Sequence, residues 1–123
     1  MTERQSQRQQ LHQTLRTCLV VIVGGLRREE KLRIVNERFG LEEVEWHEID
    51  SDSPRATDSI VNRIRNGSVG AVVVLQGLMA HKVSKRIYDA CHSCNVPYAL
   101  ADKGGTGTLE QAFSELERKL ASV

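Results

Sequence analysis

Two stretches of the chain are apolar at every position apart from one leading glycine. Residues 19–23 run Leu-Val-Val-Ile-Val, and residues 70–75 run Gly-Ala-Val-Val-Val-Leu. A strand with one solvated face alternates apolar and polar residues, whereas a strand covered on both faces is apolar throughout. We therefore predict that both stretches are central strands of a parallel sheet.

Helical spacing follows the first of these strands. Gly24 and Gly25 permit a sharp turn, and Leu32, Val35 and Phe39 then recur at the intervals of a helix face over residues 28–39. Further strands are predicted at 44–49 and 98–101, and further helices at 58–65, 79–94 and 108–120.

The alternation of strands and helices predicts an α/β fold. We expect a small open parallel sheet of about four strands in the order 2-1-3-4, with helices on both faces. Residues 18–123 then form one Rossmann-like domain. Thr57 is expected to cap the helix that starts at residue 58, and Thr108 to open the last helix with a capping box.

Residues 1–17 are polar and rich in glutamine, with Leu11 and Leu15 as their apolar pair at helical spacing. Two interpretations stay open. The segment is either a frayed terminus or a helix or arm that wraps a partner subunit.

Composition narrows the class of protein. Lysine and arginine number 17 against 16 acidic residues, so the net charge of +1 does not favour nucleic acid. No apolar run has the ~20 residues of a membrane span, and no secretory leader is visible. Three cysteines leave one unpaired, which favours a reducing, cytoplasmic location.

Candidate metal ligands follow two of the predicted strands. The carboxyl ends of parallel strands meet at one edge of the sheet, where such folds bind ligands. This edge receives His47 and His81, two of the four histidines, with Asp50 and Gln76 as oxygen donors. Mixed imidazole and oxygen ligands suit iron, zinc or manganese.

A polar stripe on the helix at 79–94 suggests how a second subunit could take part. At 100° per residue, His81, Ser84, Lys85, Tyr88 and His92 lie roughly opposite the core face. The stripe is either solvent-exposed or the interface of a two-fold homodimer. A dimer that covers an edge strand is a further expectation.

Phosphate chemistry is the alternative at the same edge. Backbone N–H groups at a helix start bind anions, and Gly24, Gly25, Arg27, Lys103 and Thr106 lie in the turns that precede two helices. Neither turn matches a dinucleotide or Walker fingerprint. For each turn taken alone, a tight turn and helix cap without a ligand is the favoured explanation.

The pair Cys91 and Cys94 matches a CxxC spacing, but it falls at the end of a helix. A redox CxxC needs a helix N-terminus, where the dipole lowers the thiol pKa. We interpret both cysteines as structural. A cluster with Cys18 stays open.

From residue 19 to about 120 the chain resembles a bacterial domain-of-unknown-function family, number 2325. The resemblance is carried by Val-Gly-Gly after the first strand, Trp46-His47-Glu48, Ala80-His81-Lys82, Cys91 and the turn Lys103-Gly-Gly-Thr. The chain departs from the family pattern at Ile49, Asp50 and Gln76. The resemblance implies a fold and a histidine site but no reaction.

Together these features predict a metal-binding homodimer. Whether it is an enzyme stays open, with a non-enzymatic role favoured. Iron is the favoured ion, a dinuclear centre is possible at a dimer interface, and dioxygen is the expected ligand to be bound or sensed. The alternative is a regulatory module for a nucleotide or phosphorylated metabolite. A third class, an interaction protein with an empty edge, stays open.

Overall fold

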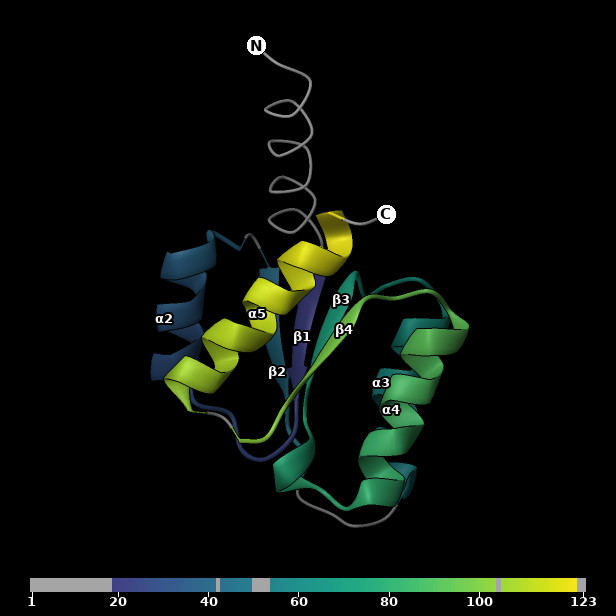
Figure 1. The fold of residues 1–123 in the computed structure, drawn as a ribbon. Helices are drawn as coiled ribbons and strands as arrows, with labels where there is room; N and C mark the ends of the chain where they lie inside the picture. The colour runs from purple at the N-terminus through teal and green to yellow at the C-terminus, as the bar shows by residue number, and fades with distance from the viewer. Residues whose placement is uncertain (1–18, 42, 50–53, 104, 122–123) are drawn as a thin grey trace.

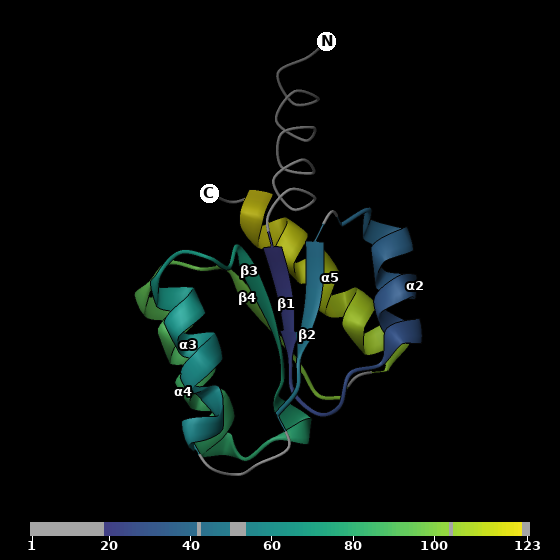
Figure 2. The same ribbon diagram turned by 180° about the vertical axis from the view of Figure 1, so that it is seen from behind.

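A parallel sheet lies between two layers of helices, as Figures 1 and 2 show from opposite sides. This computed structural model describes residues 19–41, 43–49, 54–103 and 105–121. The sheet has four strands in the order β2-β1-β3-β4, which confirms the predicted order. The strands are β1 (Leu19–Val23), β2 (Glu43–His47), β3 (Ala71–Leu75) and β4 (Tyr98–Ala101).

Helices cover both faces of the sheet, as predicted. One layer holds α2 (Glu29–Phe39) and α5 (Thr106–Ala121), and the other holds α3 (Asp58–Arg65) and α4 (His81–Ser93). Two short 3-10 turns, η1 (Pro54–Thr57) and η2 (Gln76–Leu78), precede α3 and α4. Figure 1 looks onto the β4 edge of the sheet, and Figure 2 looks onto the β2 edge.

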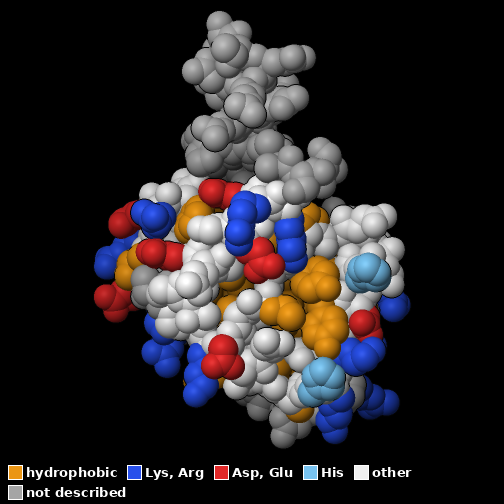
Figure 3. Space-filling view, viewed as in Figure 1, with side chains coloured by type: hydrophobic (Ala, Val, Ile, Leu, Met, Phe, Trp, Pro, Cys, Tyr) orange, Lys and Arg blue, Asp and Glu red, His pale blue; other side chains and the backbone are white. Residues whose placement is uncertain are grey.

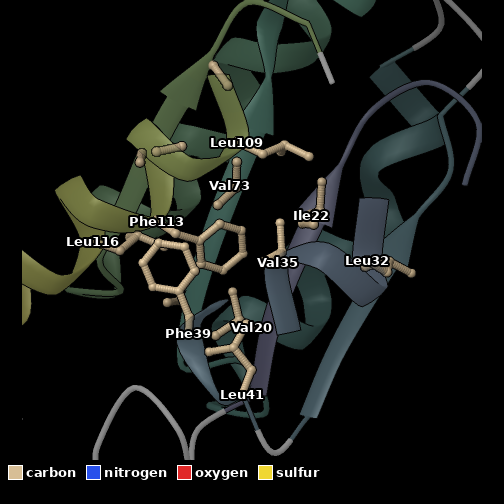
Figure 4. Close-up of a cluster of buried hydrophobic side chains, with 14 of the residues drawn as sticks. Val20, Ile22, Leu32, Val35, Phe39, Leu41, Val73, Leu109, Phe113 and Leu116 are labelled. Carbon is tan, nitrogen blue, oxygen red and sulfur yellow. The ribbon is translucent and has the colours of Figure 1, made fainter. Parts of the chain in front are cut away.

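The two central strands are buried on both faces, which explains why they carry no polar residue. Alternate side chains of β1 and β3 enter opposite cores. Val20, Ile22 and Val73 pack beneath α2 and α5, where the rings of Phe39 and Phe113 lie 5.3 Å apart (Figure 4). The other core, beneath α3 and α4, contains Val21, Val23, Val72 and Val74.

The turn after β3 differs from its prediction. A helix was expected from residue 79, but α4 begins at His81 and η2 precedes it. The N–H of Gly77 donates to the carbonyl of Asp102 at 2.7 Å. This bond ties the chain to the end of β4, so a separate turn is needed before α4 can start.

Neither predicted helix cap forms as expected. Thr57 occupies the N-cap position of α3, but its side chain makes no capping hydrogen bond to the helix. Helix α5 begins at Thr106, so Thr108 lies inside the helix and no capping box opens there. Strand β2 ends at His47 and not at Ile49, which instead forms an isolated antiparallel bridge with Gly25.

Residues 1–17, for which a helix or arm was predicted, lie outside the described residues. Among the helices that the structure describes, none combines the length and apolar character that crossing a membrane requires.

Candidate functional site

The loops at the carboxyl ends of β1 and β2 are bound to each other. The N–H of Gly24 donates to the carbonyl of His47 at 3.1 Å, and the N–H of Ile49 donates to the carbonyl of Gly25 at 3.2 Å. The indole Nε1 of Trp46 donates to the carbonyl of Gly24 at 2.8 Å. These bonds fix the backbone on either side of His47.

The loop after β3 packs against the two glycines that follow β1. A Cβ on Gly24 would lie 2.8 Å from Cε of Met79, and a Cβ on Gly25 would lie 2.8 Å from Cδ1 of Leu78. Both glycines also have positive φ angles, of 127° and 61°. Close packing and backbone conformation therefore account for Gly24 and Gly25 without a bound phosphate.

The start of α2 is already supplied with negative charge. Glu29 and Glu30 occupy its first turn, and Arg27 forms an ion pair with Glu29 at 2.7 Å. Carboxylates at a helix N-terminus take the place that an anion would favour. The geometry around Gly24, Gly25 and Arg27 thus gives little support to a phosphate site.

The start of α5 is different. No acidic residue lies in its first turn, and Lys103 is exposed in the preceding loop. A Cβ on Gly107 would have no neighbour within 4 Å, so the approach to this turn is open. Thr106 begins the helix, and its side chain lies outside the described residues. Of the two turns in the predicted anion site, the one before α5 is therefore the more accessible to an anion.

His47 is the last residue of β2 and is half-buried. Its neighbour Trp46 points into the core beneath α2 and α5, so His47 lies on the opposite face, toward α3. Arg63 of α3 lies on this side and pairs with Glu45 at 2.9 Å. Burial, and next the charge of Arg63, lowers the pKa of His47 below its ordinary 6.5, although Glu45 acts in the opposite direction.

The other predicted ligands are more exposed or lie outside the described residues. His81 is exposed at the first position of α4, and Gln76 is exposed in η2. Asp50 is outside the described residues. Within the described part of the chain, no group of three or more His, Cys, Asp or Glu residues is arranged to hold a metal ion.

The lowered pKa of His47 predicts a specific pH dependence of stability. The unfolded chain takes up a proton near pH 6.5, whereas the folded chain resists it, so the free energy of unfolding falls as pH drops below that value. We expect His47→Gln to flatten this dependence between about pH 5 and pH 8. Urea titrations followed by the fluorescence of Trp46, the one tryptophan, measure it.

Arg63→Gln tests the cause. Removing the guanidinium should bring the pKa of His47 closer to its ordinary value and reduce the slope partway. A wild-type slope in His47→Gln would contradict the assignment.

Part of the predicted polar stripe on α4 is not at the surface. Ser84 is buried, and its hydroxyl donates to the carbonyl of His81 at 3.1 Å. Tyr88 is half-buried and stacks on Tyr98 of β4 at 6.1 Å. His81, Lys85 and His92 are exposed. The stripe is therefore exposed at His81, Lys85 and His92 and covered at Ser84 and Tyr88.

The cysteines show no feature of a redox pair. Cys91 is buried and Cys94 half-buried, and both are free thiols. Burial, with the neighbouring Cys94, raises the pKa of Cys91 to about 12, which suppresses the reactive thiolate. The structural role predicted for Cys91 agrees with its burial. Cys18 lies outside the described residues.

No protein-family model matches the chain, and no curated protein is significantly similar to it. The resemblance to family 2325 therefore stays a prediction.

Sequence reasoning missed the residues that surround the candidate ligands. Arg63 acts on His47 from another element, and the Gly77–Asp102 bond joins two loops that are 25 positions apart in the numbering. Neither contact leaves a local motif.

Proposed function

We propose that the carboxyl edge of the sheet binds a metal ion on its α3/α4 face, with His47 as the central ligand. The observation that carries this proposal is the place of His47, a half-buried imidazole at the carboxyl end of β2 on the face toward α3. Burial lowers the pKa of His47, which favours the neutral imidazole, the form that binds metal. His81 begins the helix that covers the same face.

The fit of the described residues to a metal is partial. His47 can act as one ligand, but the described residues form no cluster of three or more His, Cys, Asp or Glu side chains. The nearby guanidinium of Arg63 also disfavours a cation. The paired carboxylate of Glu45 offsets that charge. A complete site on this edge would add His81, Gln76 and Asp50. Iron, zinc and manganese all accept such a set.

If iron is bound with one coordination position open, that position would bind dioxygen. Dioxygen is therefore the ligand that we propose. The chain's contribution is to hold one neutral imidazole in a fixed place, through the bonds that join the loops after β1 and β2. A dinuclear centre needs more ligands than the described residues of one subunit bring together.

Elemental analysis of protein purified without a histidine tag tests the proposal. We expect stoichiometric iron in the wild type and a loss of most of it in His47→Ala and His81→Ala. His92→Ala is the matched control, because His92 is exposed at the far end of α4, and it should keep its metal. A change in visible absorption on exposure to air would support dioxygen binding.

Full metal content in both His47→Ala and His81→Ala would end the metal proposal. Wild-type protein that is free of metal, and that nucleotides or inorganic phosphate stabilise, would favour the alternative module. In that case the open first turn of α5, with Lys103 beside it, is the place to test by Lys103→Ala.

A further inference from the structure

The outer edge of β4 has backbone groups that no neighbouring strand receives. The N–H of Val72 donates to the carbonyl of Pro97 at 3.0 Å, so Pro97, and with it Ala99 and Ala101, face β3. Successive residues of a strand direct their backbone groups to opposite sides, so Tyr98 and Leu100 face outward. Among the described residues, no strand lies beyond β4.

One of the two outward residues is already engaged. The ammonium of Lys119, on α5, donates to the carbonyl of Tyr98 and lies 4.8 Å from the centre of its ring. A partner strand centred on Tyr98 would have to displace Lys119. The N–H and carbonyl of Leu100 are the pair that a partner strand can reach directly.

Apolar surface surrounds the outward-facing backbone of Leu100. Leu100 is 40% exposed, which makes it one of three large hydrophobic side chains exposed in the described residues. The half-buried rings of Tyr88 and Tyr98 lie on the same face of the sheet as Leu100. Figure 3 shows hydrophobic side chains gathered over β4, between α4 and α5. Contiguous exposed apolar surface commonly marks an interaction site.

The two helices that flank β4 carry opposite charges one turn apart. Lys85 precedes Asp89 on α4, and Glu115 precedes Lys119 on α5. A second copy of each helix running antiparallel reverses this order, so that positive charge comes to lie opposite negative charge. The surface is thus complementary to itself about a two-fold axis.

We propose that β4 pairs antiparallel with β4 of a second copy of this chain, with Leu100 opposite its counterpart. The two leucines exchange both backbone hydrogen bonds, as a directly opposed antiparallel pair does. The two sheets become one continuous sheet, and α4 and α5 each meet their own mate. Part of the groove along β4 and α5, which Leu100, Gln111, Glu115 and Arg118 help to line, closes in the dimer.

This arrangement separates assembly from the proposed metal site. β2 and β4 are the opposite edges of the sheet, so two His47 side chains lie at the far ends of the joined sheet. The proposed ligand His81 begins α4, but the paired residues of β4 include no proposed metal ligand. The dimer therefore forms without metal and does not rest on the proposed function.

Sedimentation velocity over a concentration series, in the presence of a chelator, tests the inference. We expect a wild-type dimer and an association constant lower by about tenfold or more in Leu100→Pro, which lacks the N–H and most of the apolar contact. Proline is tolerated on an edge strand where its N–H would face outward. Leu26→Ser is the matched control, since Leu26 is 64% exposed in the loop after β1.

A charge swap provides a second test that does not depend on folding of Leu100→Pro. Lys85→Asp should weaken the dimer, and adding Asp89→Lys should restore it, because the swapped pair is again complementary in the antiparallel mate. A wild-type monomer at every concentration would overturn the inference. So would a dimer that Leu100→Pro and Lys85→Asp leave unchanged, or one that dissociates when metal is chelated.

Discussion

Val73→Asp is expected to abolish folding. Val73 is fully buried in the third strand, where it packs beneath α2 and α5. An ionised carboxylate in this core has no partner, and its protonated form still leaves a buried polar group, at a cost of several kcal/mol. A whole domain of this size is stable by only about 5–15 kcal/mol. Circular dichroism and Trp46 fluorescence should show an unfolded chain at 25 °C.

Val21→Asp extends the test to the other core. Val21 lies in the core beneath α3 and α4 and is 0% accessible to solvent, so we expect the same outcome. Leu26→Asp is the matched control, because Leu26 is 64% exposed and its replacement should leave folding intact. Cooperative unfolding of soluble Val21→Asp protein would show that β1 is not a central strand.

Gly77→Ala is expected to destabilise the carboxyl edge of the sheet. A Cβ at this position would lie 2.2 Å from both the backbone oxygen and Oδ1 of Asp102. The carboxylate oxygen can rotate away, but the carbonyl oxygen belongs to the loop that follows β4 and cannot. We expect a loss of about 1–3 kcal/mol in the free energy of unfolding, or more if the Gly77–Asp102 hydrogen bond also breaks.

Gly107→Ala is the matched control for this glycine. It lies in the first turn of α5, and an added Cβ would meet no atom within 4 Å. Alanine is the better helix former, so this substitution should be neutral or stabilise the protein by up to about 1 kcal/mol. Urea titrations of both variants measure the difference. Equal stability of the two would contradict the close approach of η2 to the end of β4.

The predicted helices and strands agree closely with the structure wherever burial determines the residue type. The predicted helix 58–65 and strand 98–101 coincide with α3 and β4. Differences arose at ends fixed by contacts between loops. The turn η2 exists because Gly77 bonds to Asp102, and the end of β2 is set by bonds between the loops after β1 and β2. Such contacts join distant segments and leave no pattern in a local window.

The candidate site was predictable in its location but not in its chemistry. Topology alone placed His47, His81 and Gln76 at one edge, since parallel strands in a doubly wound sheet end together. The exposure of His81, the charge of Arg63 beside His47, and the packing of Leu78 and Met79 against the glycines all required coordinates. Side-chain environment depends on which elements pack together.

The sequence by itself determined the fold class, the strand order and the two cores, because the spacing of apolar residues indicates which positions are buried on folding. Only the tertiary structure decided which polar groups meet. It paired Arg63 with Glu45 beside His47, engaged the Tyr98 carbonyl with Lys119, and left the Leu100 backbone facing outward. Electrostatic and hydrogen-bond partners act over a few ångströms between segments far apart in the chain, so they are fixed only when the chain folds.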